Sequence, residues 1–225
     1  MNILIINPNS TASMTDAIGE AARAVAGPNT NITAINPKNS PASIQGPEDG
    51  QAALPHLIEL FEQEVINRDI YDALVIACFD DTGLFQLRAK SPIPVIGIGE
   101  AAFHAAMLLS DQFSVVTTMD VSIPIIIDNI EQYGFEERCI KVRASCIPVL
   151  ALEAGSIDTT AILEAEIEKA FIDDECGTVI LGCAGMADFA QSMTDKFFKP
   201  VIDGVAASIG LCEMLHRLPK PIKTT

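Results

Sequence analysis

The sequence is poor in positive charge, in histidine and in long apolar runs. It has 14 lysines and arginines against 30 aspartates and glutamates, a net charge of -16. Such a chain repels phosphate backbones, so we exclude nucleic acid as a partner. The three histidines are scattered and form no HExxH motif, which excludes a catalytic zinc site of that kind. No apolar run reaches the length of a membrane-spanning helix, so we expect no membrane association.

The six cysteines form no CxxC pair and no zinc-like spacing. The first six residues, Met1 to Ile6, carry no basic charge, and their apolar run is too short for a signal peptide. We therefore expect a cytoplasmic protein whose thiols stay reduced. Hydrophobic residues make up 49% of the chain, enough for a real core. Most of the cysteines are then expected to be small buried hydrophobic residues.

Short apolar runs alternate with stretches that have helical spacing. A helix capped by Ser10 or Thr11 follows the first run, with Met14 and Ile18 on its apolar face. Continuous apolar runs are typical of strands buried on both faces of a parallel sheet, so the pattern predicts an α/β fold. The predicted strands are residues 2–6, 31–36, 73–77, 94–98, 113–117, 141–147, 178–181 and 200–203.

The two halves of the chain resemble each other. Residues 73–78 align with 178–183, and residues 94–97 align with 200–203 at almost the same offset. This internal repeat predicts two similar flavodoxin-like lobes with parallel sheets, related by a pseudo-twofold axis, with the active site in the cleft between them. We predict a first lobe of residues 1–97 plus 205–225 and a second lobe of residues 98–204.

Cys78 and Cys183 occupy matching positions in the repeat, each where an apolar strand ends. Ligands bind at the carboxyl ends of parallel strands, and helix N-terminal amides there are expected to lower a thiol pKa. Two thiols on opposite sides of one cleft suit the inversion of a carbon that carries a hydrogen, because one sulfur can remove the proton and the other can return a proton from the far side. A disulfide-forming redox protein and a binding protein without turnover remain alternatives. The cysteines left as ordinary residues are Cys139, Cys146, Cys176 and Cys212.

Around these cysteines the sequence resembles the aspartate/glutamate racemase superfamily, and most closely its hydantoin and allantoin racemase branch. The resemblance covers residues 2 to 205 in the expected order. The segments that carry it are Asn7-Pro8-Asn9-Ser10-Thr11, Ala77-Cys78-Phe79-Asp80-Asp81-Thr82-Gly83-Leu84, residues 95–102, residues 113–118, Leu181-Gly182-Cys183-Ala184-Gly185-Met186 and residues 200–205.

The resemblance implies a racemase without a cofactor that acts on 5-monosubstituted hydantoins, a class that includes allantoin. It implies a small-molecule substrate, and we also expect a homo-oligomer. The family's two catalytic cysteines match Cys78 and Cys183. Its substrate-binding positions match Asn7, Pro8, Asn9, Ser10, Thr11, Ile44, Phe79, Asp80, Thr117, Thr118, Ala184 and Gly185.

Other branches of the superfamily resemble the chain less. Glutamate racemases carry Asn-Thr and Thr-His after their cysteines, where this chain has Phe79-Asp80 and Ala184-Gly185. Arylmalonate decarboxylases keep only the second cysteine. Maleate cis-trans isomerases keep both, so an isomerase of that kind or an Asp/Glu-type racemase stays open as an alternative. The chain departs from many relatives in having no proline before Gly83.

The sequence also predicts the roles of several other residues. Asp80, Asp81 and Asp203 are predicted to be helix caps rather than acids or bases. Glu100 and His104 are spaced to pair on one helix. Asn7 and Asn9 either orient the substrate or stabilise a turn. Backbone N–H groups after Asn7 and Thr117 are expected to hold the carbonyls of a hydantoin ring.

Overall fold

The computed structural model describes residues 1–153 and 157–219, which contain two parallel sheets of four strands each. The first sheet has the order β2-β1-β3-β4 and the second the order β6-β5-β7-β8. Each order is second, first, third, fourth along its half of the chain, so the predicted pair of similar α/β lobes is confirmed. The strands are β1 (Asn2–Ile6), β2 (Asn31–Ile35), β3 (Ala73–Ile76), β4 (Val95–Gly97), β5 (Phe113–Thr117), β6 (Cys139–Ala144), β7 (Thr178–Gly182) and β8 (Val201–Asp203).

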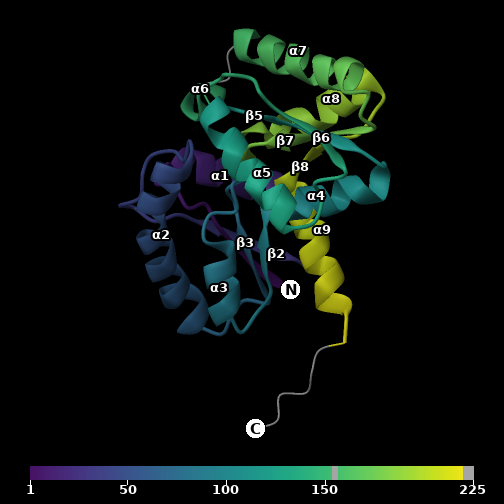
Figure 1. Cartoon of the computed structure of the whole chain (residues 1–225). Coiled ribbons are helices and arrows are strands. Elements are labelled where there is room, and N and C mark those ends of the chain that lie inside the picture. Colours follow the sequence, from purple (N-terminus) through teal and green to yellow (C-terminus); the bar gives the residue numbers. More distant parts are fainter. Residues whose placement is uncertain (154–156, 220–225) are drawn as a thin grey trace.

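Helices cover both sheets. In Figure 1 the first sheet lies below the second, with α2 and α3 beside the first sheet and α7 at the far side of the second. The α-helices are α1 (Ala12–Val25), α2 (Pro47–Phe61), α3 (Leu84–Lys90), α4 (Ile98–Leu109), α5 (Ile123–Gln132), α6 (Val149–Glu153), α7 (Ile157–Asp173), α8 (Ala190–Phe197) and α9 (Gly204–Arg217). A π-helical turn, η1 (Glu62–Ile66), and two 3₁₀ segments, η2 (Asp120–Ser122) and η3 (Ala184–Phe189), complete the described elements. None of the helices in these residues is long and apolar enough to cross a membrane.

The middle strands of both sheets are buried along most of their length. Ile3 to Ile6 of β1 and all of β3, β5 and β7 are shielded from solvent. One cluster of buried apolar side chains runs from β1 through Phe103 of α4 to Phe113 of β5 and Ile209 of α9. Burying a side chain of this size contributes about 1.5–3 kcal/mol, so this shared core fixes the two sheets against each other.

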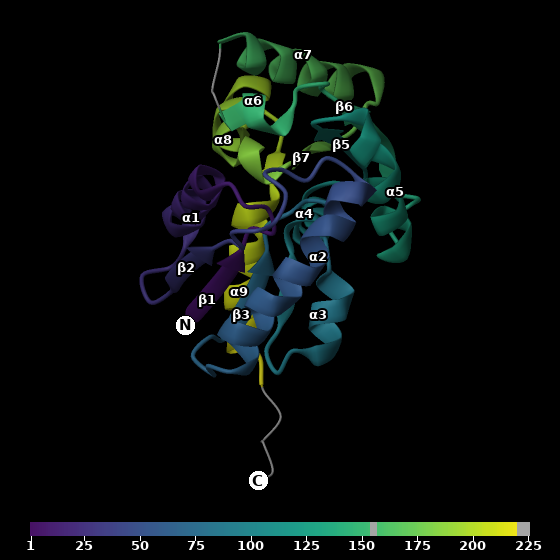
Figure 2. The same cartoon turned by 90° about the vertical axis from the view of Figure 1, so that its left-hand side faces the viewer.

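The last helix returns to the first lobe. α9 follows β8 of the second sheet, packs against α4 and α1, and runs down beside the first sheet (Figures 1 and 2). We propose that the first lobe comprises residues 1–97 plus 205–225 and the second lobe residues 98–204. Residues 154–156 and 220–225 of these ranges lie outside the described residues.

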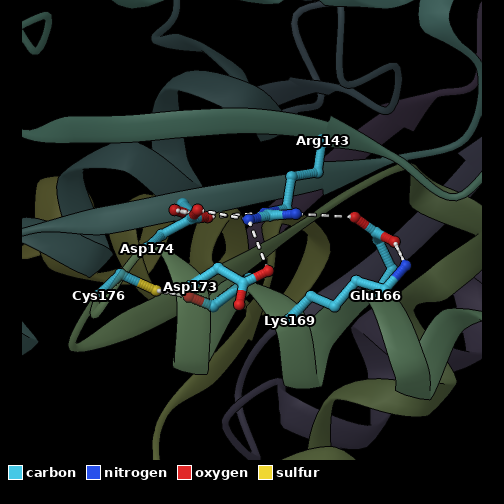
Figure 3. A network of polar contacts seen from close by, with 8 residues as sticks. Arg143, Glu166, Lys169, Asp173, Asp174 and Cys176 are labelled. Carbon is cyan, nitrogen blue, oxygen red and sulfur yellow. Dashed lines mark hydrogen bonds and ion pairs between the residues drawn. The ribbon is translucent and has the colours of Figure 1, made fainter.

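A buried ion-pair network holds the second lobe together. Arg143 of β6 is 9% exposed and donates to Asp174, with 2.7 Å from Nε to Oδ2, and to Glu166 of α7 at 3.1 Å (Figure 3). Ser114 of β5 donates to the same Asp174 carboxylate at 2.8 Å. Burial alone raises the pKa of Asp174, but the hydrogen bonds from Arg143 and Ser114 outweigh it and bring the pKa below its usual value.

Several predicted boundaries differ from the structure. The strand expected at 141–147 spans Cys139–Ala144, because Cys146 turns the chain with a φ of 57°. Cys146 is exposed and Cys139 is half-buried, contrary to expectation, whereas Cys176 and Cys212 are buried as expected. α2 begins at Pro47, a residue whose fixed φ suits a first helical turn.

Candidate active site

Cys78 and Cys183 lie just beyond β3 and β7, the matching strands of the two sheets, and line the same cavity. Both sheets therefore present their carboxyl ends to this cavity, which lies between the lobes. All six cysteines of the chain are free thiols. The cavity measures about 30 Å³. A space of that size holds about two water molecules.

The structure brings together most of the predicted site residues. Ser10, Thr11 and Gly185 do not line the cavity, and Gly185 lies in the neighbouring one instead. Met14, Ser122 and Val149 line it although the sequence did not single them out as site residues. The predicted residues that do line it are Asn7, Pro8, Asn9, Ile44, Cys78, Phe79, Asp80, Thr117, Thr118, Ala184 and Cys183.

The two thiols have matching backbone environments. The N–H of Asp80 donates to Cys78, and the N–H of Gly185 donates to Cys183, in each case from two residues further along the chain. The Thr82 hydroxyl also donates to Cys78 Sγ at 3.5 Å. These bonds favour the thiolate, but burial outweighs them. It raises the pKa of Cys183 to about 11 and also raises the pKa of Cys78, so the prediction of a lowered thiol pKa is wrong.

Asp80 places an acidic side chain in the cavity lined by Cys78 and Cys183, which we name the thiol cavity. Its carboxyl accepts no hydrogen bond from the described part of the chain, so it is not the helix cap that the sequence predicts. Burial raises its pKa to about 7, and its charge in turn raises the pKa values of Cys78 and Cys183. No lysine, arginine or histidine of the described residues lines this cavity. The titratable groups of the described lining are therefore all acidic, and a negative charge on any of them disfavours an anionic ligand.

Replacing Asp80 changes how stability depends on pH. The pKa of about 7 in the folded chain lies above the ordinary value of 3.8. The folded state therefore holds this proton between pH 4 and 7 while the unfolded state loses it, and stability falls as pH rises through that window. We expect Asp80→Asn to stabilise the protein, by about 2–3 kcal/mol more at pH 8 than at pH 5.

Urea unfolding at the two pH values measures this difference. Asp188→Asn is the matched control, because Asp188 is exposed and the substitution removes the same formal charge outside the thiol cavity. Equal stability gains at pH 5 and pH 8 for Asp80→Asn would show that the carboxyl of Asp80 titrates normally.

The turn after β1 is held by its own side chains. Asn7 Nδ2 donates to Asn9 Oδ1 at 2.9 Å and to Thr15 Oγ1 at 3.0 Å. The N–H groups of Asn9 and Thr11 donate to side-chain oxygens of this turn, and that of Ser10 donates to Pro41 O. These amides are already bonded and do not hold a ligand in this arrangement, contrary to expectation. Thr11 is the N-cap residue of α1, but its hydroxyl donates to Ala42 O at 2.6 Å and does not cap the helix.

The segment after Cys78 is anchored by residues of the second lobe. Asp81 accepts from the N–H groups of Gly99 and Glu100 at 3.0 and 2.8 Å, which caps α4 as the sequence predicts for this residue type. Tyr133, at the end of α5, donates to the same carboxylate at 2.7 Å. Asn129 of α5 donates to Asp80 O at 2.9 Å. The second lobe thus holds in place the loop that carries the first lobe's thiol.

The structure also tests the predicted roles of Asp203, Glu100 and His104. Asp203 is the N-cap of α9 and accepts from Ala206 N at 2.8 Å, as predicted. Glu100 pairs with Arg88 rather than with His104. His104 instead meets the ring of Phe135 edge-on, with 5.0 Å between centroids.

The comparisons with known proteins agree with this architecture. The family model described as Asp/Glu/Hydantoin racemase matches residues 3–212. A hydantoin racemase of Rhizobium meliloti is 44% identical over 96% of this chain and 88% of the relative. One from Pseudomonas sp. (strain NS671) is 36% identical over 98% of this chain and 88% of the relative. The structure of an allantoin racemase from Klebsiella pneumoniae superposes with a TM-score of 0.92 at 40% identity, covering 96% of this chain and 87% of that one.

Proposed function

Since this chain belongs to the Asp/Glu/hydantoin racemase family and is a racemase, we propose that it interconverts D- and L-5-monosubstituted hydantoins. In this proposal Cys78 and Cys183 are the two bases, and the reaction needs no cofactor. The observation that carries it is the pair of free thiols at equivalent strand ends of one cavity. We also propose that the enzyme is cytoplasmic and a homo-oligomer.

The chemistry follows from the position of the two thiols. The C5–H of a hydantoin is acidified by the neighbouring C4 carbonyl, because the electrons left behind form an enolate. One sulfur, as thiolate, takes the C5 proton and becomes a thiol. The opposite thiol gives its proton to the other face of C5 and becomes the thiolate. The backbone N–H groups of Asp80 and Gly185 and the hydroxyl of Thr82 stabilise whichever sulfur is ionised.

The charge of the cavity favours a neutral substrate over the alternatives. Aspartate, glutamate and maleate bring carboxylates that need a cation or an array of amide donors. The described lining of the thiol cavity has neither lysine nor arginine, and it carries the carboxyl of Asp80. A hydantoin ring brings two carbonyls and two N–H groups without charge. The lining offers hydrogen-bonding side chains for these at Asn9, Thr118 and Ser122.

Polarimetry with optically pure D- and L-5-methylhydantoin tests the proposal. We expect the rotation to decay to zero from both enantiomers faster than without enzyme, and the C5 hydrogen to exchange in D2O. The rate should rise between pH 7 and 9, since the pKa of Cys183 lies near 11 and more thiolate forms as pH rises. Turnover of maleate, aspartate or glutamate without turnover of the hydantoin would refute the proposal.

A further inference from the structure

A second cavity adjoins the thiol cavity. It measures about 210 Å³ and shares Met14, Val149 and Ala184 with the thiol cavity, so these three residues lie at the junction. Its walls come from three elements: α1 of the first lobe, and α6 and η3 of the second. Figure 2 shows α1 on the left, below α6 and α8. The larger space therefore opens from the thiols along the boundary between the lobes.

The lining of this second cavity is almost entirely apolar. Ile18, Leu152 and Phe189 contribute its larger side chains, beside the shared Met14 and Val149. Asp188 is the one charged residue of the described lining, and it is exposed to solvent. The polar groups that a hydantoin ring needs all belong to the thiol cavity instead. The two cavities thus divide into a polar space at the thiols and an apolar space beside it.

We propose that this second cavity, which we name the substituent cavity, receives the group on C5 and selects hydantoins with apolar 5-substituents over those with a polar ureido group such as allantoin. The proposal rests on the proposed function and defines its substrate class. A ureido group entering this cavity leaves its hydrogen-bonding water and finds few partners, which costs binding energy. An alkyl group gains from the same burial.

The apolar lining of the substituent cavity also suits both enantiomers that an inversion at C5 interconverts. The substituent changes face at C5 when the proton returns from the opposite side, so its position differs between the enantiomers. Polar partners at fixed angles would favour one enantiomer, whereas an apolar wall is not directional and accepts both. The apolar lining therefore suits the substituent in either of its two positions.

Two substitutions that fill the substituent cavity test this. Ala17 of α1 and Ala187 of η3 both line it and lie outside the thiol cavity. We expect Ala17→Leu and Ala187→Leu each to lower the ratio of kcat/KM for 5-isobutylhydantoin to that for 5-methylhydantoin about tenfold or more. The wild-type enzyme should prefer 5-isobutylhydantoin over allantoin by about tenfold or more.

Ala24→Leu is the matched control. Ala24 lies seven residues further along α1, is exposed like Ala17, and does not line the substituent cavity. This variant should keep the wild-type ratio. Equal losses for both alkyl hydantoins in the filling variants, an unchanged ratio in both, or a wild-type preference for allantoin would overturn the proposal. Failure of the wild type to racemise even 5-methylhydantoin would instead overturn the proposed function.

Discussion

Replacing either Cys78 or Cys183 by serine is expected to reduce racemisation of 5-methylhydantoin about 10³-fold or more. A serine hydroxyl has a far higher pKa than a thiol and neither takes nor returns the C5 proton at neutral pH. Each inversion needs both groups, so the two single variants should lose activity to a similar extent. Initial rates from polarimetry, compared with the enzyme-free rate, measure the loss.

Cys146→Ser serves as the control for these variants. Cys146 is exposed and does not line the thiol cavity, and its Sγ contacts Asp120 at 3.4 Å. This variant should racemise at the wild-type rate. If it were inactive too, the loss in the other variants would not be specific to the paired thiols. Wild-type rates in Cys78→Ser or Cys183→Ser would rule out the two-base mechanism.

Replacing Arg143 by alanine is expected to lower the free energy of unfolding by about 3–5 kcal/mol. The substitution leaves the Asp174 and Glu166 carboxylates without their buried cation (Figure 3). Hydrogen bonds bring the pKa values of both carboxyls below normal despite their burial, from Arg143 and Ser114 at Asp174 and from Lys169 and Arg143 at Glu166. The stabilisation is therefore present above the normal carboxyl pKa and is lost as pH falls through the lowered values. Urea unfolding at pH 7 measures it.

Two further variants show which contacts of Arg143 account for the loss of stability. Arg143→Lys keeps the charge but loses the two-pronged bond to Asp174, so it should recover only part of the stability. Asp173→Asn removes the weaker, 3.7 Å partner, whose side chain is 59% exposed, and should cost less than about 0.5 kcal/mol. A loss below 1 kcal/mol for Arg143→Ala would mean that the network is not important for folding.

The architecture was accessible from the sequence because buried parallel strands have a strong local pattern. Runs such as Ala73 to Ile76 and Thr178 to Leu181 are apolar throughout, and the repeat between them predicts two equivalent lobes. The same repeat singles out Cys78 and Cys183 among the six cysteines. Their shared cavity follows once equivalent strands carry their ends to one place.

Tertiary packing decided what the sequence did not reveal. Met14 and Val149 look like ordinary core positions, and only the approach of α1 and α6 places them at both cavities. The direction of the thiol pKa shift depends on how deeply the thiols are buried, which a strand-end motif does not specify. Asp80 and Asp81 are neighbours of one residue type, yet Asp81 caps a distant helix while Asp80 lines the thiol cavity.

Hydrogen exchange at C5 in the two cysteine variants tests the central claim most directly. Each variant keeps one thiol, which removes and returns the proton on its own face only. We predict that, in D2O, Cys78→Ser exchanges the C5 hydrogen of one pure enantiomer of 5-methylhydantoin without racemising it, and Cys183→Ser exchanges that of the other. Proton NMR together with polarimetry follows both events. Exchange of the same enantiomer by both variants would contradict a mechanism with one thiol on each face.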